Sequence, residues 1–318
     1  MFTRILGRSG IEVSALGMGC WAIGGPWWGS NGRAMGWSKV NDNESIRSIH
    51  AGLDMGVNFF DTAANYGAGH SERILGRAIA GKRDKVVIAT KFGYIINEET
   101  KVIYGDDDVL LKNIRQDCER SLARLNTDYI DIYQLHAGSY DPQKAIAVRE
   151  VLEELVIEGK IRAYGWSTDH PDRARVFALG VHCASIQFSL NVFHDNPRMR
   201  DICQEFDIGG INKKPLNSGI LTGKFTPDTT FPADDFRHKA VSFKEGIGAE
   251  RLQQVEALRE LLTQNGRTLT QGALAWIWSL DERMIPIPGF KTVDQVRENA
   301  GAMEFGPLED TAMRQIDE

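Results

Sequence analysis

The sequence has no apolar run near the roughly 18 residues that a membrane-spanning helix requires, and its first ten residues, MFTRILGRSG, contain no stretch of signal-peptide type. Its four cysteines form no CxxC pair and have no companion histidines at metal-ligand spacing. It also lacks a basic block, because its 43 acidic and 37 basic residues are scattered and give a net charge of -6. These absences predict a cytoplasmic protein with reduced thiols, and they argue against nucleic acid or a membrane as its partner.

The 318 residues also lack a linker or a change of composition, so we expect one domain over residues 1–318. After a predicted hairpin at residues 3–13, eight short apolar runs alternate with helix-length segments. The predicted strands are residues 14–17, 57–60, 86–90, 129–134, 163–166, 184–188, 209–211 and 284–287. The predicted helices are residues 42–55, 71–80, 108–125, 142–158, 171–179, 197–206, 244–265, 269–280 and 293–300. This alternation favours a (β/α)8 TIM barrel, with the N-terminal β-hairpin closing its bottom, over an open doubly wound sheet.

Three long segments interrupt the alternation, at residues 20–40, 92–107 and 214–243. They follow the first, third and seventh strands of the predicted barrel. The loops at the carboxyl ends of barrel strands form the binding surface in this fold. We therefore expect these segments to line the functional site.

One glycine-rich run invites a dinucleotide-binding interpretation. Residues 17–22, GMGCWA, fit the pattern GxGxxA after a strand, but Gly24, Gly25 and Pro26 follow where the Rossmann helix has to begin. Without a helix N-terminus there is no dipole to hold a pyrophosphate. The run therefore does not predict a Rossmann domain.

Ionisable side chains stand where two successive strands end. Asp61 and Lys91 follow or end these strands, and Tyr66 lies on the loop after the first. Bringing a phenol pKa from about 10 to near neutrality takes about 4 kcal/mol, and a neighbouring ammonium would supply much of this free energy while a carboxylate keeps the lysine charged. The three groups therefore predict proton transfer to a carbonyl or from an alcohol. A structural ion pair beside a packed tyrosine fits the same spacing.

A histidine follows a third strand on the same predicted face. His136 comes two positions after residues 129–134, at the end of this strand, where a neutral imidazole could orient a substrate carbonyl. A metal-dependent barrel hydrolase would need several His and carboxylate ligands at strand ends. Only His136 and Asp61 are so placed, so no metal site is predicted.

Five phrases of the sequence resemble the aldo-keto reductases, in order and at the intervals typical of that family. They are GVNFFDTAANYG, SERILGRAI, VVIATKFG, LNTDYIDIYQLH and IPGFKTVDQVREN, and the resemblance extends from Leu6 to about Ala302. The last phrase is similar to a bacterial branch with an IPG-x-K/R cofactor motif. The resemblance implies a (β/α)8 barrel, carbonyl reduction or alcohol oxidation, and an extended nicotinamide cofactor. It also implies a catalytic tetrad, with Tyr66 as general acid: Asp61, Tyr66, Lys91 and His136.

The same resemblance implies which residues contact the cofactor. Ser167 and Gln187 match the positions that bind the nicotinamide carboxamide. The loop after the seventh strand matches the pyrophosphate segment through Leu216, Ser218, Gly219, Leu221, Gly223 and Lys224, and Lys213 and Pro215 just before it are also expected to contact the cofactor. The adenosine segment matches Gly289, Lys291, Thr292, Gln295, Glu298 and Asn299. Since Lys291 could pair with a ribose 2′-phosphate, NADP(H) is favoured, with NAD(H) as the alternative.

The sequence departs from the family pattern at three places. Lys213 stands where the family usually has an aromatic residue that stacks on nicotinamide, and Lys214 replaces its polar neighbour. The stem of Lys213 could cover the ring, and its ammonium could contact a phosphate or an anionic substrate. Residues 137–139, Ala-Gly-Ser, replace a bulky pair and predict a wider pocket, and Thr168 replaces a common asparagine.

Aromatic residues on the first and third long segments mark the expected substrate end. Trp21, Trp28 and Tyr94 stand among polar residues such as Asn31 and Arg33, which suits a sugar or another polyhydroxylated carbonyl. Packing of the segment against the barrel explains the tryptophans nearly as well. The predicted function is therefore an NAD(P)(H)-dependent oxidoreductase acting on a small carbonyl or alcohol. The alternative is a cofactor-sensing regulatory or accessory subunit.

Overall fold

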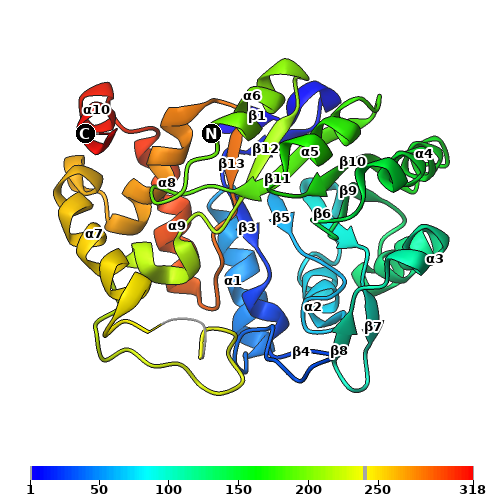
Figure 1. Ribbon diagram of the computed structural model, residues 1–318, viewed down its shortest axis with the longest axis horizontal. Helices are drawn as coiled ribbons and strands as arrows, with labels where there is room; N and C mark the ends of the chain where they lie inside the picture. The colour runs from blue at the N-terminus through cyan, green and yellow to red at the C-terminus, as the bar shows by residue number, and fades with distance from the viewer. Residues whose placement is uncertain (1, 239–241, 318) are drawn as a thin grey trace.

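The computed structural model describes residues 2–238 and 242–317, and its centre is a sheet of eight parallel strands (Figure 1). The predicted positions 239–241 of the third long segment lie outside the described residues. In the order in which they pair, the strands are β13 (Met284–Pro286), β12 (Gly209–Lys213), β11 (Cys183–Ser189), β10 (Ile161–Ser167), β9 (Ile130–Leu135), β6 (Val87–Phe92), β5 (Phe59–Asp61) and β3 (Gly17–Gly19).

The two edge strands of this sheet meet, so the sheet curls into a barrel. Gly19 of β3 forms a parallel bridge with Gly289, just after β13, and its amide donates to the carbonyl of Pro288 at 3.0 Å. A Cβ atom on Gly19 would lie 2.7 Å from the carbonyl oxygen of Ile287, so the seam requires glycine there. The predicted (β/α)8 barrel is confirmed.

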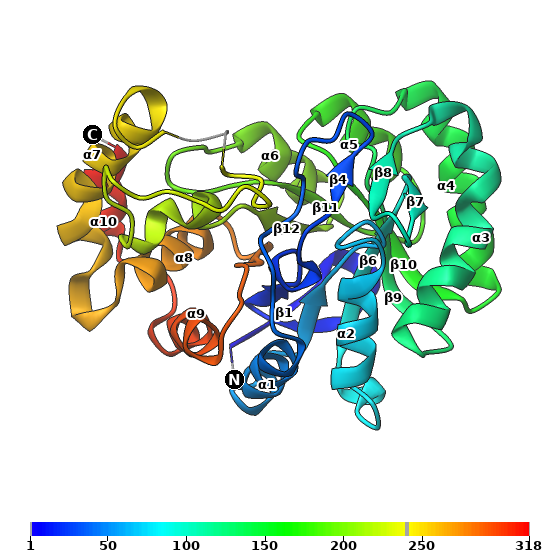
Figure 2. The same cartoon turned by 90° about the horizontal axis from the view of Figure 1, so that it is seen from below.

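Helices surround the barrel, as the view from below shows (Figure 2). They are α1 (Asp42–Asp54), α2 (His70–Ala78), α3 (Asp107–Leu125), α4 (Pro142–Ile157), α5 (Pro171–Ala178), α6 (Pro197–Glu205), α7 (Gly246–Leu262), α8 (Leu269–Leu280), α9 (Val293–Phe305) and α10 (Asp310–Asp317). None of these helices in the described part of the chain is long and apolar enough to cross a membrane.

Helix α4 shows how the local sequence determines such an element. Asp141 caps its N-terminus by accepting from the amides of Gln143 and Lys144, and Pro142 occupies the first turn, where no amide is needed. Its buried residues recur at helical spacing and face the sheet: Ala145, Val148, Leu152 and Leu155. Burial of apolar surface contributes about 25 cal/mol of free energy per Å² and stabilises the packing of each helix on the barrel.

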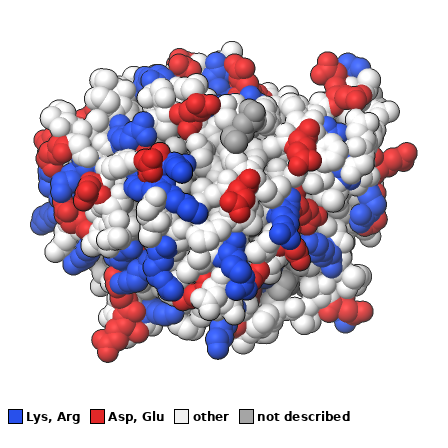
Figure 3. Space-filling view, turned by 180° about the vertical axis from the view of Figure 1, so that it is seen from behind, with Lys and Arg blue, Asp and Glu red and all other residues white. Residues whose placement is uncertain are grey.

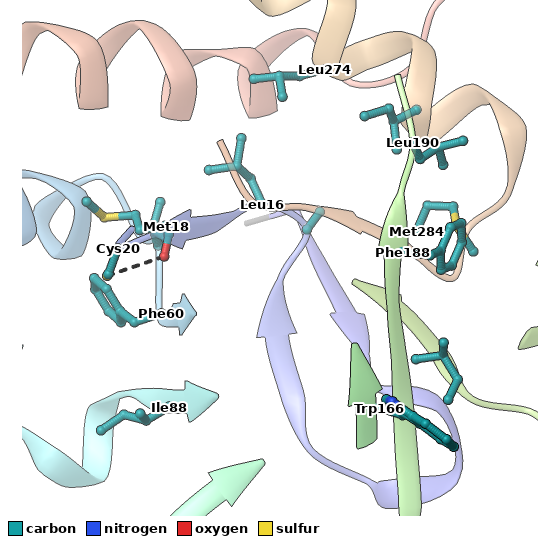
Figure 4. Close-up of a cluster of buried hydrophobic side chains, with 14 of the residues drawn as sticks. Leu16, Met18, Cys20, Phe60, Ile88, Trp166, Phe188, Leu190, Leu274 and Met284 are labelled. Carbon is teal, nitrogen blue, oxygen red and sulfur yellow. Dashed lines mark hydrogen bonds between the residues drawn. The ribbon is translucent and has the colours of Figure 1, made fainter. Parts of the chain in front are cut away.

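Apolar side chains fill the space on both sides of the barrel wall. Figure 4 shows part of the layer between the strands and the helices, with Met18, Phe60 and Ile88 at the left of the view and Phe188 and Met284 at the right. Inside the barrel, a separate cluster joins inward residues of the strands to residues of the N-terminal hairpin: Leu6, Ile11, Val13, Phe59, Val87, Ala89, Ile132, Ala163, Ala184, Ile211, Ile285 and Ile287.

The N-terminal hairpin consists of β1 (Thr3–Ile5) and β2 (Glu12–Ser14), which pair in antiparallel fashion. It packs on the interior cluster through Leu6 and Val13, both fully buried. Arg8 fastens it to the barrel by donating to the carbonyls of Ala178 and Cys183. The hairpin therefore closes the bottom of the barrel, as predicted.

The structure corrects the first predicted strand and adds a small sheet. Ser14 pairs within the hairpin, so the first barrel strand begins at Gly17 instead of residue 14. The third sheet joins β4 (Trp28–Gly29), β8 (Val102–Tyr104) and β7 (Ile95–Asn97). Strand β4 pairs with β8, although more than 70 residues separate them in the sequence. Pairing between such distant segments leaves no periodic pattern in the sequence.

The surface carries both signs of charge. On the face in Figure 3, basic and acidic side chains are interspersed. All four cysteines lie in the described part of the chain, where they are buried and unpaired.

Candidate active site

The structure brings the predicted tetrad together at the carboxyl ends of the strands. Asp61 ends β5, Lys91 lies near the end of β6, and His136 directly follows β9. Tyr66 lies on the loop after β5, where its amide donates to the carbonyl of Ala63 at 3.1 Å. Neighbouring parallel strands thus place four polar groups at one mouth.

The ammonium of Lys91 is fully buried and is the centre of this group. It donates to Oδ1 of Asp61 at 2.5 Å, to the carbonyl of Thr62 at 2.7 Å and to the hydroxyl of Tyr66 at 3.3 Å. A lysine ammonium has three hydrogens, and all three have acceptors here. Lys91 is therefore held in one orientation, directed at the phenol.

The carboxylate of Asp61 is also buried, and amide groups hold its second oxygen. Oδ2 accepts from Nε2 of Gln134 at 3.1 Å and from Nε2 of Gln187 at 2.8 Å. The Oε1 atom of Gln187 accepts in turn from the hydroxyl of Ser167 at 2.9 Å. A continuous hydrogen-bonded path therefore links Ser167 to Tyr66.

Burial and neighbouring charge act against each other at Lys91 and Tyr66. Burial lowers the pKa of Lys91, but Asp61 and Tyr66 outweigh it, so this pKa lies above its ordinary value. Burial raises the pKa of Tyr66 and outweighs the opposing charge of Lys91. The sequence argument expected the pKa of Tyr66 to approach neutrality, whereas burial raises this pKa above its ordinary value.

His136 is held as a neutral ring. Its Nδ1 lies 3.0 Å from Oδ1 of Asn65, and the rings of Tyr66 and Tyr94 meet it edge-on at centroid distances of 5.9 and 5.4 Å. Burial, followed by the charges of Lys91 and Lys213, holds the pKa of His136 well below its ordinary value. An uncharged imidazole therefore faces the site.

A cavity of about 880 Å³ opens beside these groups. Asp61, Tyr66 and His136 line it, whereas Lys91 lies behind them. The predicted cofactor residues that line it are Ser167, Gln187, Lys213, Pro215, Leu216, Ser218, Gly219, Lys224, Gly289, Lys291, Gln295, Glu298 and Asn299. The predicted substrate residues Trp21 and Tyr94 also line it.

Besides Lys91, four predicted site residues do not line the cavity. Leu221 is fully buried in the core, and Gly223 ends a 3₁₀ turn with a φ of 69°. The hydroxyl of Thr292 caps α9 by accepting from the amide of Gln295. Trp28 pairs with β8, and its neighbour Trp27, which directly precedes β4, lines the cavity in its place.

The segment after β12 crosses the mouth and adds residues that sequence reasoning missed. The amide of Phe236 donates to the carbonyl of Gly36 at 2.9 Å, and its ring stacks on Trp21 at 4.6 Å. Arg237 lines the cavity, donates to both oxygens of buried Asp235 and lies 4.1 Å above the Trp37 ring. No motif in the sequence distinguishes Arg237 from other arginines.

Basic side chains gather along the same cavity: Lys213, Lys214, Lys224, Arg237 and Lys291. Lys291 connects two of the long segments, since its ammonium donates to the carbonyl and hydroxyl of Ser38 at 3.0 and 3.2 Å. No group of three or more His, Cys, Asp or Glu side chains within residues 2–238 and 242–317 is arranged to hold a metal ion.

Comparison with known proteins identifies the family. The family model described as the aldo/keto reductase family matches residues 15–318. Aldo-keto reductase YhdN of Bacillus subtilis is 35% identical over 275 residues, which cover 85% of this chain and 78% of that protein. Aldo-keto reductase yakc [NADP(+)] of Schizosaccharomyces pombe is 31% identical over 326 residues, covering 99% and 90% of the two chains.

A solved structure agrees over nearly the whole chain. The glycerol dehydrogenase AKR11B4 from Gluconobacter oxydans superposes with a TM-score of 0.82 and 31% identity, covering 99% of this chain and 94% of that one. The family match, the barrel and the similarity to these proteins agree. The chain is therefore an oxidoreductase of the aldo/keto reductase family.

Proposed function

We propose that this protein catalyses the NADP(H)-dependent reduction of a small carbonyl compound, or the oxidation of the corresponding alcohol, with Tyr66 transferring the proton. The observation that carries the proposal is the buried Lys91 ammonium, which is bound to Asp61 and lies 3.3 Å from the Tyr66 hydroxyl. Membership of an oxidoreductase family supports it, as does the name of the yeast relative, which includes NADP(+).

The cavity suits a phosphorylated dinucleotide in size and in charge. Its volume of about 880 Å³ falls within the usual range for ligand sites, and the six basic side chains that line it, Arg33 among them, match the charge of several phosphates. We propose that Ser167 and Gln187 hold the carboxamide, that Lys224 and Arg237 hold the pyrophosphate, and that Lys291 holds the 2′-phosphate. When bound, the cofactor would supply or accept a hydride.

Side chains of the protein would then transfer the proton. Tyr66 donates its phenolic proton to the carbonyl oxygen as negative charge develops there, and the Lys91 ammonium stabilises the phenolate that remains. Asp61 keeps Lys91 charged and in place. The neutral ring of His136 orients the carbonyl oxygen toward Tyr66.

The pH dependence of the reaction rates should follow from the shifted pKa values of Tyr66 and His136. Burial raises the pKa of Tyr66 and lowers that of His136, so neither group should titrate between about pH 7 and pH 9. Since carbonyl reduction uses the phenol, its kcat should stay flat over this range, whereas alcohol oxidation uses the phenolate and should accelerate as the pH rises. Steady-state rates in both directions test this. A reduction rate that follows a group titrating near pH 7 would contradict it.

Replacing Lys291 by Met should discriminate between the two nucleotides. If Lys291 binds the 2′-phosphate, the Kd for NADPH should rise about tenfold or more, which is the scale of a charge-assisted hydrogen bond. The Kd for NADH, which lacks this phosphate, should change by less than about twofold. Titrations of protein fluorescence with each nucleotide measure both values. Equal weakening of the two nucleotides would remove Lys291 from 2′-phosphate recognition.

For the substrate, we propose a small polyhydroxylated carbonyl or its alcohol. Trp21, Trp27 and Tyr94 line the cavity beside Asn31 and Arg33, which combines aromatic faces with hydrogen-bonding groups. The related Gluconobacter protein is named a glycerol dehydrogenase. Turnover on a panel of short sugars and polyols, compared with apolar aldehydes of equal size, tests the proposal. Nucleotide binding without turnover on any member would favour the sensor function.

A further inference from the structure

Lys213 stands at the last position of β12, at the mouth of the barrel. It pairs in register with Ser189 at the end of β11, the strand that also carries Gln187, and β10 ends nearby at Ser167 (Figure 1). Lys213 lines the cavity together with Ser167 and Gln187, and its side chain is 27% exposed. Its ammonium therefore lies at the same end of the cavity as the residues proposed to hold the carboxamide.

One carboxylate anchors this ammonium. Oδ2 of Asp169 lies 3.3 Å from Nζ of Lys213, and Asp169 also accepts from the amide and the hydroxyl of Ser189, at 2.6 and 3.3 Å. These bonds hold the carboxylate at the rim between β10 and β11. Among the residues that the structure describes, Asp169 is the carboxylate that forms an ion pair with Lys213.

The charge of Lys213 reaches the catalytic groups. Burial, the charge of Lys91 and then the charge of Lys213 together hold the pKa of His136 well below its ordinary value. Burial lowers the pKa of Lys213, Asp169 opposes this shift without cancelling it, and the charges of Lys214 and Lys91 lower the pKa further. The end of the cavity beside His136 therefore carries positive potential from two lysines.

We propose that Lys213 makes this site prefer the reduced cofactor over the oxidised one. The inference rests on the proposed function, in which the nicotinamide lies at this end of the cavity. Reduction of NADP⁺ adds a hydride, two electrons and a proton, to the ring and removes the ring's positive charge. Both forms carry the same phosphates, so a nearby cation repels only the oxidised ring. A stacking aromatic side chain, by contrast, carries no charge that distinguishes the two forms in this way.

The ratio of the two dissociation constants, Kd for NADP⁺ over Kd for NADPH, isolates this effect. Replacing Lys213 by Met keeps the length of the stem and removes the charge, and we expect the ratio to fall about tenfold. A tenfold change corresponds to about 30 mV in the two-electron potential of the bound couple. Replacing Asp169 by Asn removes the counter-charge, so the ratio should rise. Opposite shifts in two neighbouring variants exclude general damage to the site.

Lys291→Met is the matched control, because it removes a lysine from the phosphate end of the same cavity. It should weaken both nucleotides and leave their ratio within about twofold. Calorimetric titration of each protein with NADP⁺ and NADPH measures all the values without turnover. If both nucleotides bind but Lys213→Met leaves the ratio unchanged, the role of Lys213 is wrong and the proposed function stands. If the wild-type protein binds neither nucleotide, the proposed function itself is wrong and this inference falls with it.

Discussion

Replacing Tyr66 by Phe is expected to lower kcat for carbonyl reduction by about two to four orders of magnitude, the scale of general acid catalysis. The substitution removes the hydroxyl that lies 3.3 Å from the Lys91 ammonium and leaves the ring in place. That ring also stacks on Trp21 and meets His136 edge-on, so the surrounding packing should persist. Stopped-flow and steady-state rates with a common aldehyde measure the loss.

Binding measurements separate lost chemistry from a damaged site. The Kd for NADPH of Tyr66→Phe should stay within about threefold of the wild-type value, because no proposed phosphate contact changes. Tyr104→Phe is the matched control, since Tyr104 is another phenol on the same cavity and is 43% exposed. It should retain most of the activity. Full activity in Tyr66→Phe would remove this residue from the mechanism.

Replacing Lys91 by Met should damage both stability and catalysis. The substitution leaves the Asp61 carboxylate buried without its cation, and breaking a buried ion pair in this way costs about 3–5 kcal/mol. Activity should fall by at least about two orders of magnitude, because the phenolate of Tyr66 loses its stabilising charge. Urea unfolding measures the change in stability, and the assay used for Tyr66→Phe measures the change in activity.

A second substitution separates these two effects. Asp61→Asn in the Lys91→Met background removes the orphaned charge, so much of the lost stability should return while activity stays low. Arg175→Met is the control, since Arg175 and Glu205 form an exposed pair whose loss should cost less than about 1 kcal/mol. If the double variant regained activity along with stability, Lys91 would have only a structural role.

The barrel and the tetrad are predictable because their signals are local. Each strand is a short apolar run between capped helices, and the strand ends place Asp61, Lys91 and His136 on one face whatever the details of packing. Desolvation is a property of the whole fold, however. The direction of the Tyr66 pKa shift therefore became visible only with the structure.

The parts that sequence reasoning missed depend on contacts between distant segments. Asn65 meets His136 across 71 positions, and Phe236 joins Gly36 across the mouth. Trp28 pairs with β8, which lies more than 70 residues further along the chain, whereas the adjacent Trp27 lines the cavity. Such contacts leave no spacing pattern to find.

Transfer of deuterium from the nicotinamide C4 of labelled NADPH to a carbonyl substrate tests the central claim most directly. Mass spectrometry should detect labelled alcohol with the wild-type protein. In the same reaction time, Tyr66→Phe should form little labelled alcohol, although both proteins bind NADPH. An unlabelled product, or no product from any member of a broad carbonyl panel despite tight binding of NADPH, would contradict the proposal that these four groups serve hydride and proton transfer.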